Sequence, residues 1–566
     1  MKVKQLVLQL NEQTFVDDYF RACGIEDVKE FKNPVGRYVG DVKEYSAIGR
    51  KVKLFEEYLN KAMKTQSKIA IVQDCDVDGI CSATMAFFML ERYGFQPEDV
   101  VFLYHSDKTH GLTDEIMQQI VARNDISMVI VPDAGSNDLE RISFLLDIKI
   151  NVVILDHHEV DKRYLSWLDI LQRSPGFIIV NNQLENRTNK DLCGTGVVFR
   201  FFQAFEMSFS PYDHGEYANH LDIVALANIA DVMDMRNLEN IVFNRWGLWR
   251  AIENDFLWNL CKKYCKKIVG VTPEDIAWNI APKLNAVCRS EDQATKAMVL
   301  EAFCGMREDY DDVIKAIERC YRKQREMVKD TYESLIYDDN YYELDSFGKV
   351  VIRFCAKSPY TGLIANKLVE YYNKPVLLVH TDGDLCTGSC RSPIPIREQI
   401  AECPEIIFAQ GHEHAFGVCW RKSDTKVLVD YLESLELDYD QEITVASTLD
   451  PSHIPTWLFR VTEEYAKCWG TGVESPKFYI PRIRINAKDI RELGNGTVLK
   501  FTYKDVEYVE FFASKRDKEK LLIGKNKPLI IDLIGSLGVN LYQGKETLQV
   551  KIDRFEIVEE RWENIW

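Results

Sequence analysis

The sequence has no long apolar run. None of its segments reaches the ~20 consecutive apolar residues that a membrane-spanning helix needs, and its first residues lack the apolar core of a signal peptide. We therefore expect a soluble, cytoplasmic protein. Its hydrophobic content of 46% is typical of globular proteins, and 566 residues exceed what one hydrophobic core holds, so several domains are expected.

The sequence also lacks cysteine pairs at the C-x-x-C spacing of zinc and redox sites. Its fifteen cysteines are scattered, and even Cys261/Cys265 and Cys386/Cys390 are separated by three residues rather than two. Without a secretory signal, disulfides are not expected either. We predict thiols that are reduced and mostly buried.

Positive charge is scarce over the chain as a whole. The formal net charge of −18 argues against a protein that coats nucleic acid with its entire surface. Residues 477–551 differ, because they contain fifteen Lys and Arg against nine Asp and Glu. Any contact with nucleic acid is therefore predicted to be local.

Polar residues that can bind metal follow four apolar segments, which we interpret as strands. In a parallel sheet such residues gather at the carboxyl edge, where ligands bind. Carboxylates packed together repel one another unless a cation neutralises them, so the pattern predicts a site for two divalent metal ions. The segments are Lys68–Gln73 before Asp74, Asp76 and Asp78; Met128–Pro132 before Asp133; Asn151–Leu155 before Asp156, His157 and His158; and Leu221–Ala230 before Asp231.

These segments resemble motifs of the DHH phosphoesterases, and their details resemble the RecJ-like single-strand-specific exonucleases of that family. The resemblance covers nearly the whole chain, and its motifs occur in the family's order. They are Asp74-Cys-Asp-Val-Asp-Gly79, Leu192-Cys-Gly-Thr-Gly-Val-Val-Phe199, Ala227-Asn-Ile-Ala-Asp231, Ile280-Ala-Pro-Lys-Leu-Asn-Ala286 with Arg289, Gly388-Ser-Cys-Arg-Ser392 and Gly411-His-Glu-His-Ala-Phe-Gly417.

The resemblance implies an α/β fold: a parallel-sheet DHH domain, joined by a long helix to a smaller α/β DHH-associated domain, plus a C-terminal OB-like β-barrel. The barrel agrees with the short, regularly spaced strand patterns after residue 450. We expect an N-terminal helical cap (1–67), the DHH domain (68–300), the connecting helix (301–345), the DHH-associated domain (346–435) and the OB-like domain (450–566).

The resemblance also implies a role for each site residue. Asp74, Asp76, Asp133, His157 and Asp231 would hold two Mn²⁺ or Mg²⁺ ions; the absence of thiolate ligands agrees with these metals. His158 would act at the scissile phosphate, Asp156 would fix a histidine tautomer, and Asp78 would support the first ion. Phosphates of the strand would be held by Asn285, Arg289, Ser389, Arg391 and His412.

Two further groups of residues are candidates for binding the strand. Lys108 and His110 are placed to contact a phosphate, although a solvated loop explains them equally well. In the basic C-terminal segment, aromatic side chains would stack on bases, although strand alternation places some of them in the core. These are Tyr503, Tyr508, Phe511 and Phe512.

We therefore predict a metal-dependent 5′→3′ exonuclease for single-stranded DNA, acting in repair or recombination, with single-strand-binding protein as a candidate partner. The alternatives are a phosphodiesterase for short RNA or small nucleotides, which needs no basic barrel, and a non-catalytic scaffold, which would have lost metal ligands. Two departures from the family pattern concern the substrate. Lys283 stands where arginine is common, and Glu413, His414 and Phe416 replace small or apolar residues.

Overall fold

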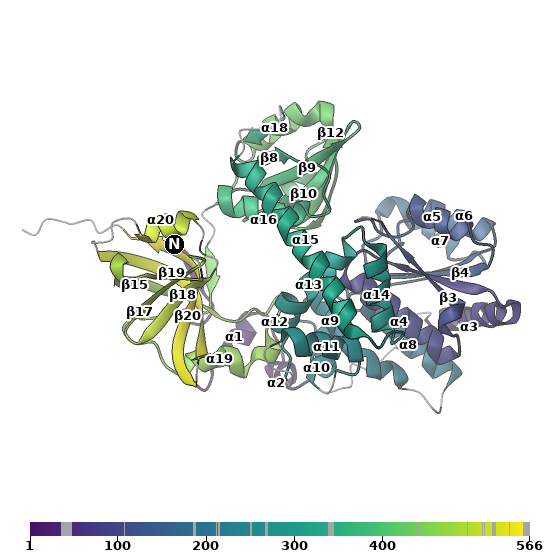
Figure 1. Ribbon diagram of the computed structural model, residues 1–566, viewed down its shortest axis with the longest axis horizontal. Coiled ribbons are helices and arrows are strands. Elements are labelled where there is room, and N and C mark those ends of the chain that lie inside the picture. Colours follow the sequence, from purple (N-terminus) through teal and green to yellow (C-terminus); the bar gives the residue numbers. More distant parts are fainter. Residues whose placement is uncertain are drawn as a thin grey trace, which may run out of the picture.

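The structure is a computed structural model (Figure 1). It describes residues 1–558 except 35–47, 107, 185–187, 211, 213–214, 250–251, 266–269, 338–343, 440–441, 495, 512, 514, 523–527 and 543. Figure 1 shows a mixed α/β body, a smaller α/β body above its helices, and a strand-rich body at the opposite end. The predicted fold class is confirmed. Within the described residues, no helix combines the length and the apolar character needed to cross a membrane.

A five-stranded parallel sheet forms the centre of the first body. The strand order β3-β2-β4-β5-β6 reverses beside β2, so the carboxyl ends of β2 and β4 border a topological switch point. Each strand is apolar because helices cover both faces of the sheet. The strands are β2 (Lys68–Gln73), β3 (Val100–Tyr104), β4 (Ile126–Pro132), β5 (Asn151–Asp156) and β6 (Phe177–Asn181).

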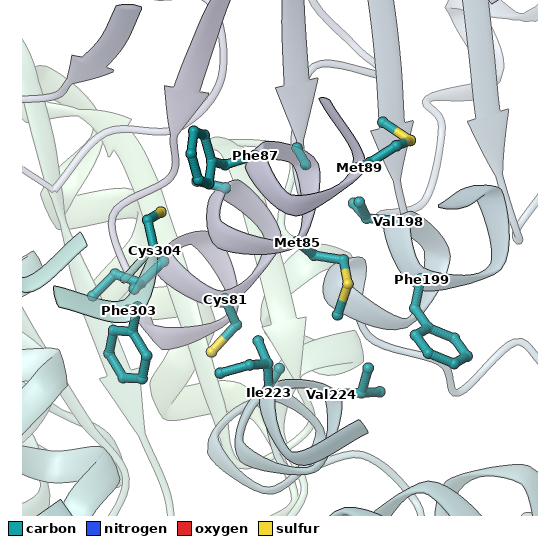
Figure 2. Close-up of a cluster of buried hydrophobic side chains, with 14 of the residues drawn as sticks. Cys81, Met85, Phe87, Met89, Val198, Phe199, Ile223, Val224, Phe303 and Cys304 are labelled. Atoms are coloured by element: carbon teal, nitrogen blue, oxygen red, sulfur yellow. The ribbon is translucent and has the colours of Figure 1, made fainter. Parts of the chain in front are cut away.

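The helices on the two faces form separate hydrophobic cores. One face packs against α5 (Asp114–Val121), α6 (Leu139–Asp147) and α7 (Leu165–Leu171). The other packs against α3 (Ile48–Thr65), α4 (Val77–Tyr93) and α8 (Gly194–Phe209). Figure 2 shows the second core around α4, which packs between the sheet and helices that include α8. Because α4 is buried all round, its first turn is held firmly at the end of β2.

Helices continue the first body beyond residue 215. The segment Leu221–Ala230, which we predicted as a strand, is helix α9. At ten residues it is long for a strand, and its uniform burial removes the alternation that would distinguish the two structures. The others are α10 (Leu238–Trp249), α11 (Asp255–Tyr264), α12 (Pro273–Asp275), the π-helix η5 (Ile276–Ile280), α13 (Ala281–Cys288) and α14 (Gln293–Phe303).

The 28-residue helix α15 (Tyr310–Tyr337) connects the first body to the smaller α/β body. It contacts α13 and α14 at one end and α16 at the other. A six-stranded sheet of order β11-β12-β10-β9-β8-β7 forms the smaller body. Its elements are β7 (Ser346–Phe347), β8 (Val351–Phe354), α16 (Thr361–Tyr372), β9 (Val376–Asp382), β10 (Leu385–Arg391), α17 (Arg397–Ala401), β11 (Ile406–His412), β12 (Ala415–Arg421) and α18 (Thr425–Ser434).

The C-terminal body is a seven-stranded sheet of order β14-β15-β19-β20-β18-β17-β16. It shares one hydrophobic core with the first helices of the chain, and β1 pairs with β13. Its elements are β13 (Ile443–Val445), β14 (Ser447–Thr448), α19 (Leu458–Glu464), β15 (Lys477–Asn486), β16 (Arg491–Leu493), β17 (Val498–Tyr503), β18 (Val506–Phe511), α20 (Lys515–Leu522), β19 (Pro528–Tyr542) and β20 (Lys545–Ile557). The N-terminal elements are β1 (Val3–Gln5), α1 (Phe15–Ala22) and α2 (Val28–Lys32).

The candidate stacking residues of this body differ in exposure. Tyr508 is buried and stacks on Phe501 with ring centroids 5.0 Å apart, so it belongs to the core. Tyr503 is half-buried, whereas Phe511 is 47% exposed. Phe512 lies outside the described residues. Of the three that the structure describes, Phe511 is the most exposed.

All fifteen cysteines are free, and thirteen of them are buried. The prediction of reduced, mostly buried thiols therefore agrees with the structure.

Short helical turns connect the main elements: η2 (Pro97–Asp99), η3 (Lys162–Tyr164), η4 (Glu216–His220), η6 (Lys422–Asp424), η7 (Ala466–Cys468) and η8 (Ala487–Asp489).

Candidate metal centre and phosphate-binding residues

Two predicted metal ligands, Asp74 and Asp76, lie between the end of β2 and the start of α4. The Asp74 carboxylate accepts hydrogen bonds from His110 Nδ1 (2.5 Å) and from the backbone N–H of Gly111 (3.2 Å). Asp76 is the N-cap of α4 and accepts from the backbone N–H of Gly79 at 2.9 Å. A Cβ atom at Gly79 would lie 2.5 Å from the backbone oxygen of Asp74, so glycine is needed for this tight connection.

Asp133 follows β4 and faces these two carboxylates. One oxygen from each of Asp74, Asp76 and Asp133 lies within 4.8 Å of the others. Burial, and then the charges of Asp78, Asp76 and Asp74, raise the pKa of Asp133 well above its ordinary value. Its buried Oδ1 has no hydrogen-bond partner among the described residues. A carboxylate that is buried, unpartnered and close to others has the properties of a cation ligand.

His157 joins this cluster to Asp231. Its Nε2 lies 3.2 Å from Asp133 Oδ1, 3.7 Å from Asp231 Oδ2 and 3.9 Å from Asp78 Oδ2. Asp231 reaches this position as the C-cap residue of α9. Burial, and then the charge of His158, lower the pKa of His157, which favours the neutral ring that a metal ligand requires. The fold thus brings all five predicted ligands to one place.

Asp156 fixes the backbone and the ring of the adjacent histidines. Its Oδ1 accepts from the backbone N–H groups of His157 (2.7 Å) and His158 (3.1 Å) and lies 2.8 Å from His158 Nδ1; Oδ2 accepts from the backbone N–H of Ser136. Burial disfavours the Asp156 carboxylate, but these bonds outweigh it and lower its pKa. Burial also disfavours a charged His158, yet Asp156 raises the pKa of His158 to about 9.

Asp78 contacts the first turn of α8. Its carboxylate accepts from the backbone N–H groups of Gly194 (2.7 Å) and Thr195 (2.8 Å) and from the Thr195 hydroxyl (2.5 Å). A carboxylate at a helix N-terminus is stabilised by these free N–H groups. A Cβ atom at Gly194 would lie 2.3 Å from Asp133 Oδ1, so the absence of a side chain at this position lets the backbone of α8 lie against the acidic cluster. Asp78 is therefore placed to position α8 as well as to face His157.

Three basic side chains from different parts of the chain lie close to one another beside the acidic cluster. Partial burial, and then the charges of Arg289 and Arg391, lower the pKa of Lys108. Burial likewise lowers the pKa of Arg391, with Arg289 adding to the effect. A Cβ atom at Gly362 would lie 2.5 Å from Arg391 Nη2, so this glycine makes room for the guanidinium. Lysine and arginine held close together suit a polyanionic ligand.

The predicted phosphate-binding residues differ in burial. Asn285 Oδ1 and Arg289 Nε are buried without a hydrogen-bond partner among the described residues. Ser389 is buried, and its hydroxyl lies 2.9 Å from that of Thr361. His412 is exposed at the end of β11 and makes no hydrogen bond or ion pair with the other predicted site residues that the structure describes. The geometry therefore connects His412 least to the rest.

Two histidines lie near Asp74: His110, which we predicted only as a phosphate contact, and His105, which we did not predict. His110 lies against Asp74 and 3.6 Å from Cys75 Sγ, and the Asp74 charge raises the pKa of His110 well above its usual range. His105 is buried, with Nε2 4.0 Å from Asp74 Oδ1. The position of His105 directly after β3, the neighbour of β2, is the signal that would have indicated it. Lys283, in contrast, lies over the ring of Tyr264, 4.3 Å from its centroid.

Comparison with known proteins agrees with this arrangement. The family model for the DHH family N-terminal domain matches residues 68–228, and that for the RecJ OB domain matches residues 447–554. A Bacillus subtilis strain 168 protein, YorK, provisionally named a prophage-derived single-strand DNA-specific exonuclease, is 27% identical over 94% of both chains. The single-stranded-DNA-specific exonuclease RecJ of Haemophilus influenzae is 23% identical over 97% of both chains.

The fold is also that of solved RecJ structures. The Thermus thermophilus RecJ in complex with Mn²⁺ superimposes with a TM-score of 0.73 at 17% identity, covering 98% of this chain and 80% of that chain. The same protein in complex with Mg²⁺ gives a TM-score of 0.68, covering 98% and 78%. The chain thus contains one segment that matches the DHH family N-terminal domain and one that matches the RecJ OB domain, and it is similar to RecJ exonucleases over nearly its whole length.

Proposed function

We propose that this chain is a metal-dependent exonuclease that hydrolyses single-stranded DNA from its 5′ end. The observation that carries the proposal is the convergence of Asp74, Asp76, Asp133 and His157 at the switch point of the sheet. The donor set of carboxylates and a neutral imidazole fits Mn²⁺ or Mg²⁺. The names of the relatives and the OB domain support DNA as the substrate.

In this proposal two divalent ions are held by Asp74, Asp76, Asp133, His157 and Asp231. When bound, such ions activate a water molecule and stabilise the charge that develops on the phosphate. Burial, and then the charges of neighbouring aspartates, raise the pKa of Asp133 and Asp231, and bound cations would relieve this repulsion.

The remaining residues would bind the strand and move a proton. Lys108, Arg289 and Arg391 present positive charge to its phosphates. His158, held through Nδ1 by Asp156, keeps Nε2 for the scissile phosphate. His158 would donate a proton from this nitrogen to the leaving oxygen.

Digestion of end-labelled strands tests this proposal. With Mn²⁺ or Mg²⁺ we expect stepwise loss of long single-stranded DNA from the 5′ end, and no loss with EDTA. His157→Ala should abolish cleavage, whereas His453→Ala, which changes an exposed histidine of the C-terminal body, should leave it unchanged. Cleavage confined to the shortest DNA or RNA would instead identify a small-substrate phosphodiesterase. Strand binding without any metal-dependent cleavage would identify a scaffold.

The wider cellular role follows from the same activity. We infer that removal of 5′-ended single strands serves repair or recombination of DNA, and that single-strand-binding protein is a candidate partner. Both inferences are tested by whether that protein, bound to the strand, increases the rate of digestion. A rate that falls as the strand is covered would count against the partnership.

A further inference from the structure

The helical segment that carries Asn285 and Arg289 begins with an irregular turn. From α12 to α13 the chain is helical throughout, but Ile276–Ile280 forms a π-helix in which the Ala281 N–H bonds to the Ile276 carbonyl. Pro282 accounts for this, because it has no N–H for the carbonyl four residues earlier, which belongs to Trp278, and its ring crowds that carbonyl. Short π-turns inside helices frequently mark functional sites.

Trp278 is placed on the solvent side of this turn. It is 73% exposed, more than any other tryptophan that the structure describes, although the body around it has a large hydrophobic core. Packing does not explain why a large apolar ring at this π-turn is exposed to water.

Trp278 shares one face of the helix with the predicted phosphate-binding residues. Pro282, Asn285 and Arg289 recur at intervals of three and four residues on one side of α13 and its C-cap, and Trp278 precedes Pro282 by about one turn through the π-helix. Trp278 precedes Asn285 by seven residues, roughly 10 Å along the axis. On this face, Asn285 Oδ1 and Arg289 Nε are buried without partners among the described residues.

The opposite end of the segment leads toward the C-terminal body. Helix α12 contacts η7, which belongs to that body, and Figure 1 shows α12 and α13 in the middle of the molecule, between the strand-rich body and the parallel sheet. The face that carries Trp278 therefore extends from the candidate active site in the direction of the OB domain.

We propose that Trp278 stacks on a base of the single strand where the strand leaves the active site. Every base has a face on which an indole ring can stack, so this contact would hold the strand without selecting its sequence. At roughly 10 Å from Asn285, it would engage a nucleotide beyond the one being removed. The proposal rests on the proposed exonuclease function. It adds a residue that binds the part of the strand that is not yet digested.

The test compares Trp278→Ala and Trp278→Phe with Phe144→Ala. Phe144 is a matched control, because it is a half-exposed aromatic on α6, which covers the other face of the sheet. Binding of a fluorescein-labelled 20-residue oligo-dT is measured by anisotropy with Ca²⁺ in place of Mn²⁺, and cleavage of a dinucleotide is measured with Mn²⁺.

For Trp278→Ala we expect the Kd of the 20-residue strand to rise about tenfold, with a smaller rise for Trp278→Phe, which keeps an aromatic face. Dinucleotide cleavage should be unchanged in both variants, and Phe144→Ala should resemble wild type throughout. Wild-type affinity in Trp278→Ala, or equal losses on the 20-residue strand and the dinucleotide, would overturn the proposal. Wild-type binding without cleavage would instead refute the exonuclease function and leave the stacking test valid.

Discussion

Two glycines allow the acidic residues to gather as closely as they do. A side chain at Gly79 would clash with the backbone of Asp74, and one at Gly194 would clash with the carboxylate of Asp133. The backbone itself therefore brings β2, α4 and α8 to the cluster. In this arrangement the repulsion among carboxylates is not relieved by distance; together with burial it raises the pKa of Asp133, and a bound cation would relieve it without protonation.

The role of Asp156 can be separated from that of the ligands beside it. In Asp156→Asn, one carboxylate oxygen becomes an NH₂ group, which cannot accept from the backbone N–H that it faces, and the negative charge beside His158 is lost, so the orientation of His157 and His158 should weaken. We expect the concentration of Mn²⁺ needed for half-maximal cleavage to rise about 10–100-fold, as is usual when a residue that orients metal ligands is changed. A metal titration of strand cleavage measures this.

Asp125→Asn provides the matched control for that experiment. Asp125 precedes β4, at the amino end of the strand whose carboxyl end carries Asp133, and its carboxylate forms an exposed pair with Arg123. This variant should keep the wild-type metal requirement. An unchanged requirement in Asp156→Asn would show that the histidines are oriented by other contacts.

At the level of elements, apolar runs predicted the strands of the parallel sheet well. Strands β2 (Lys68–Gln73) and β4 (Ile126–Pro132) are predictable because both faces of the sheet are covered, which makes each strand largely apolar and leaves a polar residue just after it. The same property led to the wrong prediction of a strand at Leu221–Ala230. A helix buried on every side is also apolar throughout, so composition cannot separate the two.

The candidate site was predictable to the extent that its residues lie in continuous motifs. Asp74, Asp133 and His157 follow strands directly, so the topology of a parallel sheet brings them together. The contact of His110 with Asp74 was not predictable, because it depends on how the loop after β3 folds back over β2. The turn of Lys283 toward Tyr264, away from a phosphate role, likewise depends on the packing of α11.

Strand β18 contains an acid whose ionisation should oppose folding. Burial, and then the charge of Asp517, raise the pKa of Glu510 to about 7, and its buried Oε2 has no hydrogen-bond partner among the described residues. Between pH 4.5 and 7 the unfolded chain would release this proton while the folded chain keeps it. The C-terminal body should therefore lose stability as pH rises through this window.

Glu510→Gln removes that ionisation. Relative to wild type, the variant should gain roughly 1 kcal/mol between about pH 5 and about pH 8, a figure reduced for solvent screening because Glu510 is partly exposed. Thermal unfolding at the two pH values measures the difference. Glu492→Gln, on the exposed strand β16, should show the same pH dependence as wild type. A parallel response of wild type and Glu510→Gln would show that Glu510 ionises normally when folded.

At the level of the whole molecule, the two ends of the chain form one structural unit. The resemblance predicts an N-terminal helical cap over residues 1–67, and α3 packs on the parallel sheet. Residues of α1 and α2, however, are part of the core of the C-terminal body. Sequence could not predict this, because the apolar stripe of a short helix does not specify which distant surface covers it.

This sharing of a core predicts that a change near the N-terminus will act on the far end of the chain. Phe15 is fully buried, with ring centroids 5.7 Å from Trp457 and 5.9 Å from Phe478. Phe15→Ala should destabilise the C-terminal body by about 3–5 kcal/mol, the usual loss for a buried phenylalanine. Hydrogen exchange should therefore accelerate in β15 and β19 and stay slow in β2 and β4. Leu8→Ala, which changes an 81% exposed side chain in the same segment, should leave both regions protected.

Equal acceleration in β2 and β4 would mean that the bodies unfold together. If the acceleration is confined to the C-terminal body, that body unfolds separately from the metal centre, and cleavage of a dinucleotide by Phe15→Ala should continue at conditions where binding of long strands is lost.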